Sequence, residues 1–273
     1  MPLVAHYSER SPDVASRPGR LTLAVRGLPS IELTSDRGVF SGARVDPGTA
    51  VLLETVPPPP AVGALLDLGC GYGPIALTLA RWSPGATVWG VDVNERAVAL
   101  CVANATTHLL PNVRAVAVPA AWEAADGDAA IGNAVEGNAA RGGAARGGAA
   151  RGGAARGDAA DEEASANVLP TGLRWAAIYS NPPIRVGKGS LQALLDRWLP
   201  ELDDGADAWL VVQKHLGADS LQRWLVEERG WACDRIASRK GYRVLRVGRP
   251  GSVGPAGRVG RLGAPRPASP VPK

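Results

Sequence analysis

One short stretch of the chain has the residue types needed to hold a small ligand against the backbone. An apolar run contains Asp67, and glycines follow at every second position, with a cysteine between the first two: Gly69, Cys70, Gly71 and Gly73. Glycine adopts backbone conformations that other residues avoid and lets the main chain approach a ligand closely. The helix expected next would add its N-terminal amide groups. The carboxylate of Asp67 would repel a phosphate but could hold the ammonium group of an amino acid.

A second carboxylate, Asp92, follows the next apolar run, 23 residues after Gly69. In nucleotide-binding α/β folds an acid at this place accepts hydrogen bonds from ribose hydroxyls. The glycine spacing is GxGxG rather than the GxGxxG of dinucleotide-binding folds, and the stretch has no Walker lysine. The alternative role for Asp92, an N-cap for the next helix, is better filled by Asn94. Together these residues predict a site for S-adenosylmethionine rather than for NAD or ATP.

The third chemical feature is the run Ser180-Asn181-Pro182-Pro183-Ile184, after another apolar segment. Proline has no N–H group, so this corner presents carbonyl groups and the side chain of Asn181. Each residue before a proline is driven toward an extended conformation, which fixes the direction of its carbonyl. A stiff loop rich in acceptors suits a substrate that donates two hydrogens, such as an exocyclic amine. The alternative is a turn that only ends a strand.

Alternating short strands and helices are expected to position these residues. The expected strands cover residues 64–68, 86–93, 113–118, 175–179 and 206–213, and the expected helices cover residues 74–82, 95–109, 190–199 and 219–229. This alternation is typical of a parallel sheet with helices on both faces. The carboxyl ends of parallel strands meet at one edge of such a sheet, where ligands bind. All three chemical features would therefore lie at the same edge.

The two ends of this core predict antiparallel additions. Residues 21–26 and 31–34 form a predicted β-hairpin, and Asp46-Pro47 predicts the start of a helix over residues 49–56. The last strands, residues 232–237 and 242–247, are joined too tightly for a parallel crossover. The predicted fold is therefore a Rossmann-like α/β fold with a seven-stranded, mostly parallel sheet, an antiparallel last strand and an N-terminal β-hairpin.

The motifs resemble those of class I S-adenosylmethionine-dependent methyltransferases of the small-domain group, which includes guanine-N2 enzymes of ribosomal RNA. The resemblance covers about residues 6–248 without the insert described below, and these segments carry it: 38–41, 45–49, 67–74, 90–94, 104–105, 180–188 and 240–244. It implies that the glycine turn, Asp92 and Val93 bind the cofactor, with Asn181 beside them. It further implies that Asn181, Pro182, Pro183 and Ile184 hold the target base.

The resemblance implies methyl transfer to the exocyclic N2 of a guanine, in small-subunit ribosomal RNA. Many members have an aromatic residue, which stacks on the base, where this chain has Ile184, so Phe40 is the candidate platform. Alternative targets are a protein glutamine side chain or adenine N6. A protein of this fold that binds cofactor or RNA without catalysis is the alternative from another class.

Positive charge near these motifs indicates where RNA would dock. Arg185 and Lys188 follow the Asn-Pro-Pro corner. Four further cations lie near the closing hairpin: Arg239, Lys240, Arg243 and Arg246. Of these four, Lys240 and Arg243 are the main candidates for RNA contact. A phosphate contact by such residues releases counterions and strengthens binding. For most of them a solvated charged surface is the competing interpretation.

Two segments lack the apolar residues needed for a packed core. Residues 127–166 hold a five-residue Ala-Ala-Arg-Gly-Gly repeat, and residues 249–273 form a basic tail rich in proline and glycine. Both are predicted to be disordered. The prediction is a single methyltransferase domain over residues 1–248 that carries the insert. Slippage in a tolerant loop is favoured for the repeat over RNA binding, since the seven acids between Asp126 and Glu163 outnumber its four arginines.

The rest of the composition limits which partners and which cellular compartment are expected. The 273-residue chain has a formal charge of +4, three cysteines without a CxxC pair and three scattered histidines. We expect no metal site, because metal ligands at typical spacing are missing. No apolar run approaches the roughly 18 residues of a membrane span, and no signal peptide is recognisable. The expected location is a reducing cytoplasm.

Overall fold

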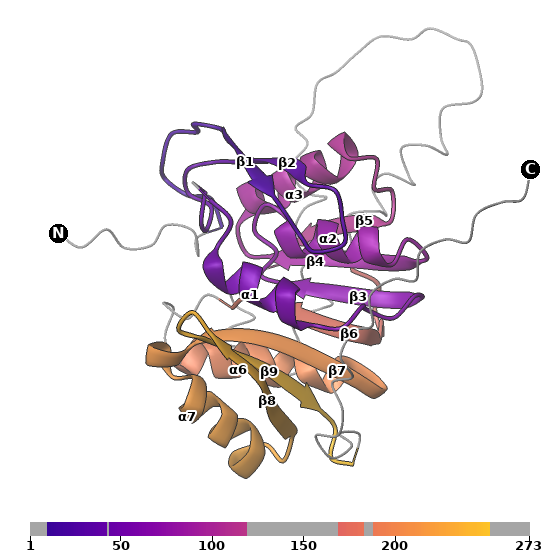
Figure 1. Ribbon diagram of the computed structural model, residues 1–273, viewed down its shortest axis with the longest axis vertical. Helices are drawn as coiled ribbons and strands as arrows, with labels where there is room; N and C mark the ends of the chain where they lie inside the picture. Colours follow the sequence, from indigo (N-terminus) through magenta and orange to yellow (C-terminus); the bar gives the residue numbers. More distant parts are fainter. Residues whose placement is uncertain (1–9, 43, 119–168, 183–187, 252–273) are drawn as a thin grey trace, which may run out of the picture.

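The computed structural model describes residues 10–42, 44–118, 169–182 and 188–251. A seven-stranded sheet forms its centre, in the order β5-β4-β3-β6-β7-β9-β8 (Figure 1). The strands are β3 (Gly63–Leu68), β4 (Ala86–Asp92), β5 (Val113–Ala117), β6 (Trp175–Ser180), β7 (Leu202–Gln213), β8 (Ala232–Arg239) and β9 (Tyr242–Gly248). Neighbours from β5 through β7 pair in parallel. The strand order therefore reverses at β3: β4 and β5 follow on one side of it, and β6 and β7 on the other.

Apolar residues on both faces of the central strands explain this arrangement. In β3, Leu65 belongs to the core on one face, whereas Leu66 belongs to the core on the other. The first core also contains side chains of the helices α1 (Pro47–Thr55), α2 (Pro74–Trp82) and α3 (Glu95–Thr107). The second contains side chains of α6 (Lys188–Trp198) and α7 (Ala218–Arg223). A strand buried on both faces reads as a continuous apolar run, as these do.

The predicted antiparallel end of the sheet is confirmed. Strand β9 pairs antiparallel with both β7 and β8. The turn between β8 and β9 places Lys240 and Gly241 at φ angles of 51° and 81°. Two successive residues with positive φ are typical of a two-residue hairpin turn, whose twist matches that of the strands. In Figure 1 the strands β7–β9 lie in the lower part of the view, and β3–β5 lie above them.

The N-terminal hairpin and the following helix also form as predicted. Strands β1 (Gly19–Leu23) and β2 (Ile31–Ser35) pair antiparallel. Asp46 is the N-cap of α1, and Pro47 is the first residue of that helix. The buried Asn104 of α3 fixes the hairpin, because its side chain accepts from the N–H group of Thr34 and donates to the Thr34 carbonyl.

Several boundaries differ from the prediction, most of them by one to three residues: β1 covers Gly19–Leu23 rather than residues 21–26, for example, and α3 ends at Thr107 rather than at residue 109. Strand β7 begins at Leu202, four residues before the predicted start, and α7 passes at Trp224 into a π-helical turn that ends at Glu228. The predicted insert lies outside the described residues, as does the tail from residue 252 onward. Arg249, at the start of the predicted tail, donates to the carbonyl groups of Pro200 and Leu202. Among the described helices, none is long and apolar enough to cross a membrane.

Candidate active site

The glycine motif forms a tight loop between β3 and α2, at the carboxyl ends of the parallel strands. All three glycines have positive φ angles. A Cβ atom at Gly73 would lie 2.6 Å from Leu77 Cδ1, whereas a Cβ atom at Gly71 would meet nothing within 4 Å. Gly73 is therefore required by packing inside the protein. Gly71 borders open space, where its backbone can meet a ligand.

Asp67 lies directly beneath this loop and is completely buried. Its Oδ2 accepts a hydrogen bond of 2.9 Å from the backbone N–H of Ala76 in α2. Its Oδ1 is buried and has no hydrogen-bond partner among the described residues. Burial, together with the nearby charge of Asp92, raises the pKa of Asp67 to about 8. A buried acceptor without a donor is costly, and a cationic group would compensate it.

Asp92, at the end of β4, holds the loop from the other side. Its Oδ2 accepts from the N–H of Gly71 at 2.9 Å, and its Oδ1 accepts from the N–H of Asn94 at 2.9 Å. Burial of the carboxyl group raises the pKa of Asp92 to about 6. Asn94 caps α3, as the sequence predicted, with bonds from the N–H groups of Arg96 and Ala97. Each Asp92 oxygen keeps acceptor capacity for a ligand hydroxyl.

Two other predicted cofactor residues contribute less through their side chains. Cys70 is buried, and the pKa of its thiol is raised well above normal by a hydrogen bond with Cys101 and by burial. Its backbone N–H donates to the Val91 carbonyl, which draws the loop over β4. Val93 is partly exposed directly after Asp92. Cys70 therefore acts as part of the packed loop rather than as a reactive thiol.

A segment that starts after β2 passes over this edge of the sheet. The Asn94 side chain donates to the carbonyl of Gly38 at 2.7 Å, which anchors the segment beside β4. Phe40 follows the anchor and is partly buried. The segment reaches α1 at Asp46, which contacts the end of β6, as described next. Phe40 therefore lies in the connection between the Gly38 anchor and the start of α1.

Asn181, directly after β6, is held by two residues at the start of α1. Its Nδ2 donates to Oδ1 of Asp46 at 2.8 Å and to Oγ1 of Thr49 at 3.0 Å. The preceding residue, Ser180, is buried and donates to the Leu68 carbonyl of β3 at 2.7 Å. These bonds tie the Asn-Pro-Pro corner both to the strand that leads into the glycine loop and to α1.

The remaining predicted target-base residues are only partly described. Pro182 is buried next to Asn181. Pro183, Ile184 and Arg185 lie outside the described residues. The contact of Asn181 with Asp46 and Thr49 was not foreseen, because the sequence pattern marked Asp46 only as a helix cap. The adjacent family motif, residues 45–49, was the available signal.

The predicted RNA-docking cations divide into two groups. Arg243 is buried and pairs with Asp219, so the expectation that it contacts RNA is withdrawn. Arg239 approaches Glu54 within 3.8 Å, and Arg246 pairs with Asp207 at 2.9 Å. Lys188 and Lys240 are exposed, and no described acid lies within ion-pair distance of either. Packing against acidic neighbours decides this difference, which the sequence did not reveal.

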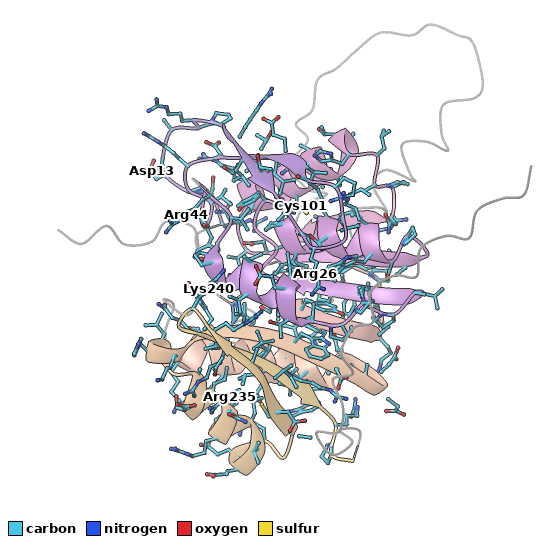
Figure 2. All side chains as sticks on the ribbon, in the orientation of Figure 1. Asp13, Arg26, Arg44, Cys101, Arg235 and Lys240 are labelled. Carbon is cyan, nitrogen blue, oxygen red and sulfur yellow. The ribbon has the colours of Figure 1, made fainter. Side chains whose placement is uncertain are left out.

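Two cations that the sequence motifs did not single out lie at the same edge. Lys214 follows β7, and its N–H donates to the Gly241 carbonyl in the β8–β9 turn. Arg44 precedes α1 by three residues. Both are exposed and, among the described residues, unpaired. Figure 2 shows Arg44 and Lys240 toward the same side of the molecule, near the start of α1.

Comparisons with known proteins identify the family. The methyltransferase small-domain family matches residues 30–134, which include the glycine loop and Asp92. The uncharacterised protein YbxB of Bacillus subtilis is 30% identical over 242 residues, which cover 89% of this chain and 97% of that protein. This chain belongs to the methyltransferase small-domain family. It is an S-adenosylmethionine-dependent methyltransferase.

Shorter and structural similarities agree with this family. Ribosomal RNA small subunit methyltransferase C (RsmC) of Shewanella amazonensis is 42% identical over 76 residues, 27% of this chain and 22% of that protein. The structure of T. thermophilus RsmC, in complex with AdoMet and guanosine, matches with a TM-score of 0.58 and 24% identity. That match covers 87% of this chain and 52% of the other, so this chain spans about half the length of T. thermophilus RsmC.

The site residues fit the cofactor of this family. Oδ1 of Asp67 is a buried acceptor without a donor, and the cofactor's methionine part carries an ammonium group. The loop backbone at Gly71 borders open space. A carboxylate with acceptor capacity, Asp92, lies directly against that backbone. These groups would suit the ammonium group and the ribose hydroxyls of S-adenosylmethionine.

Proposed function

We propose that this methyltransferase acts on the exocyclic N2 amine of a guanine in small-subunit ribosomal RNA. The observation that carries the proposal is the orientation of Asn181. Both N–H groups of its amide are directed at Asp46 and Thr49, so its oxygen remains as an acceptor next to the cofactor edge. An acceptor fixed in this way suits a substrate nitrogen that carries hydrogens.

The amine needs this help because its lone pair is delocalised into the purine ring. Asn181 Oδ1 and the Pro182 carbonyl would accept hydrogen bonds from its two N–H groups and turn the lone pair toward the methyl group. S-adenosylmethionine, when bound, supplies a methyl group already activated by its sulfonium. The nitrogen–carbon bond forms as the sulfur–carbon bond breaks, and the extra proton leaves the nitrogen for water. The protein then contributes chiefly proximity and oriented dipoles.

The cofactor contacts follow from the same geometry. Asp92 would accept hydrogen bonds from the ribose hydroxyls while it holds the N–H of Gly71. Asp67, whose Oδ1 lacks a partner, would face the ammonium group of the methionine part. Val93 and the backbone of Cys70 would complete the wall of this half of the site. Phe40 remains the candidate for stacking on the base.

The choice of RNA is supported by charge and by relatives. Four exposed cations at the carboxyl edge have no acidic partner within the described part of the chain: Arg44, Lys188, Lys214 and Lys240. Such cations are available to phosphates, and each phosphate contact releases counterions. Similar proteins carry the name RsmC, and the T. thermophilus protein of that name is a 16S rRNA N2 methyltransferase.

The proposal is tested by transfer of labelled methyl groups into small ribosomal subunits. The subunits come from cells that lack this gene, so that the target guanine is unmodified. Digestion to nucleosides should give labelled N2-methylguanosine from 16S RNA and none from 23S RNA, and Asn181→Ala should remove the signal. Label in N6-methyladenosine or in a protein glutamine would instead identify adenine or a protein as the substrate. Cofactor binding without transfer to RNA, protein or DNA would favour the non-catalytic alternative.

A further inference from the structure

The start of α1 has a hydrogen bond that helix capping does not explain. Oδ1 of Asp46 accepts from the N–H groups of Gly48 at 2.7 Å and Thr49 at 3.2 Å, which is the usual pattern of an N-cap. The same oxygen also accepts from Asn181, 135 residues further along the chain, at 2.8 Å. A serine caps helices about as well, but its oxygen lies one bond closer to the backbone than Oδ1 of Asp46, so we expect it to bond to Asn181 weakly or not at all.

The chemistry of the partners determines which way the Asn181 amide points. An ionised carboxylate only accepts hydrogen bonds, so Asn181 must present its NH₂ group to Asp46. Oγ1 of Thr49 receives the second N–H at 3.0 Å. The amide oxygen is then forced to the opposite side. Without these two acceptors the amide could flip, and its N–H groups would face the N–H groups of a substrate amine.

The surroundings make this contact strong. Thr49 is 3% exposed. The ring of Tyr242 in β9 packs so closely on α1 that a Cβ atom at Gly48 would lie 2.8 Å from its Cε1. The charge of Asp46 also contributes, after burial, to the raised pKa values of Tyr72 and Tyr242. Asp46 thus lies near both the glycine loop and β9, and its partner Thr49 is buried.

We propose that Asp46, assisted by Thr49, is a positioning residue for methyl transfer: it fixes the Asn181 amide so that its oxygen accepts from the substrate amine. This inference rests on the proposed function, in which Asn181 is that acceptor. The carboxylate polarises the amide it binds, which strengthens acceptance at the oxygen. Asp46 itself does not touch the substrate.

Substitutions can separate capping from positioning. Asp46→Ser keeps the N-cap and releases Asn181, so kcat should fall about 10- to 100-fold, the effect of losing a hydrogen bond to a charged group. KM, cofactor affinity and melting temperature should stay near wild type. Asp46→Asn keeps an acceptor oxygen and should retain most of the rate. Thr49→Val should slow transfer about 3- to 10-fold, for the loss of one neutral hydrogen bond.

A matched control exists in the same helix. Thr55 also has a hydroxyl group, but that group donates to the Val51 carbonyl of its own helix. Thr55→Val should therefore leave kcat unchanged. In an Asn181→Ala background, Asp46→Ser should change kcat less than about twofold, because the two residues act as one unit. An equal loss in both backgrounds would show that Asp46 acts without Asn181 and would overturn the inference.

A second measurement needs no substrate. The side-chain amide protons of Asn181, assigned by their disappearance in Asn181→Ala, should exchange slowly with water in the wild type and faster in Asp46→Ser. If the wild type methylates no RNA but shows this change, the proposed substrate is wrong and the positioning contact stands. If exchange is the same in both proteins, positioning by Asp46 is wrong, whatever the substrate.

Discussion

The proposed cofactor half and the proposed substrate half of the active-site edge are built in different ways. The cofactor half comes from residues 67–92, and its carboxylates bond to backbone N–H groups of the same stretch and of Asn94. The substrate half comes from four separate segments. Asn181 is held by side chains of α1. The cations at this edge come from Arg44, α6, the end of β7 and the β8–β9 turn.

The two halves therefore depend on different kinds of contact within the chain. In the cofactor half the glycine loop and two buried acids form one local unit, whose cost is the desolvation of carboxylates with raised pKa values. In the substrate half the acceptor is oriented by long-range side-chain contacts, and the surface carries cations without acidic partners among the described residues. Substitutions in the first half should affect cofactor binding, and those in the second should affect the rate of transfer or RNA binding.

The largest expected effect is that of Asn181→Ala on the rate. By analogy with removal of one oxyanion-hole donor, single-turnover transfer should fall about 10²- to 10³-fold. S-adenosylmethionine affinity should change little. Asn181→Asp would seem, from the sequence, to keep an acceptor, but it would place a second carboxylate against Asp46, so it should be nearly as slow at neutral pH. Rapid-quench assays on subunits measure this, and a full rate for Asn181→Ala would refute the mechanism.

Asp92→Ala should affect the other half. Loss of hydrogen bonds to a charged group should weaken S-adenosylmethionine binding by about 1.5–3 kcal/mol, or about 10- to 100-fold. The variant also releases the N–H of Gly71, so Asp92→Asn, which keeps an acceptor oxygen, serves as the control. Titration calorimetry reports both affinities. Unchanged affinity in a folded Asp92→Ala protein would remove Asp92 from the cofactor site.

The buried acids should make stability and cofactor affinity respond to pH in opposite directions. Because the folded pKa values of Asp67 and Asp92, about 8 and 6, lie above the ordinary 3.8, the folded state binds protons more tightly than the unfolded state. Their stabilising contribution is complete below pH 3.8 and is lost as pH rises to about 8.

Chemical denaturation of the cofactor-free protein between pH 5 and 8 should therefore show a decline on the order of 3–5 kcal/mol in the free energy of unfolding. The decline should be smaller in Asp67→Asn. Cofactor affinity should rise over the same range, since the ionised acids are the acceptors. A flat stability profile in the wild type would contradict the burial of these charges.

Charge reversal at the substrate edge should moderately weaken the binding of RNA and should not affect the binding of the cofactor. Lys214→Glu and Lys240→Glu should each weaken RNA binding several-fold and reduce the slope of log affinity against log salt by about 1. Cofactor affinity should not change. Arg26→Glu is the matched control, because Arg26 is exposed but lies away from this edge. It belongs to the β1–β2 connection, whose Pro29 carbonyl accepts from Arg81 in the last turn of α2, the end of that helix opposite the glycine loop. Equal weakening by all three would indicate binding by net charge only.

The smallest effect is expected for the repeat insert. Replacement of residues 127–166 by a short Gly/Ser linker should leave melting temperature and cofactor affinity nearly unchanged, because loop-closure entropy depends weakly on length. Differential scanning calorimetry and binding titrations test this. A selective loss of RNA affinity would instead assign the Arg-Gly repeats to RNA binding, and a loss of stability would show that the insert packs on the domain.

The sequence by itself determined the elements and the cofactor half. Apolar runs, the Asp46-Pro47 start signal and the Asn94 cap fix helices and strands locally, since each depends on neighbours within a few residues. The loop from Asp67 to Gly73 is local in the same sense. The parallel topology then brings Asp92 to it, because consecutive parallel strands joined by a helix end at one edge.

Only the tertiary structure decided the substrate half. Which way the Asn181 amide points depends on Asp46 and Thr49, which are more than 130 residues away along the chain. Whether a cation is available to RNA depends on the acids that packing brings beside it. The ion pair with Asp219 removes Arg243 from the proposed RNA contacts, and the position of Lys214 beside the β8–β9 turn adds it to them. A hydrogen bond or ion pair between distant segments has no periodicity or spacing in the sequence, so its partners become known only when the chain is folded.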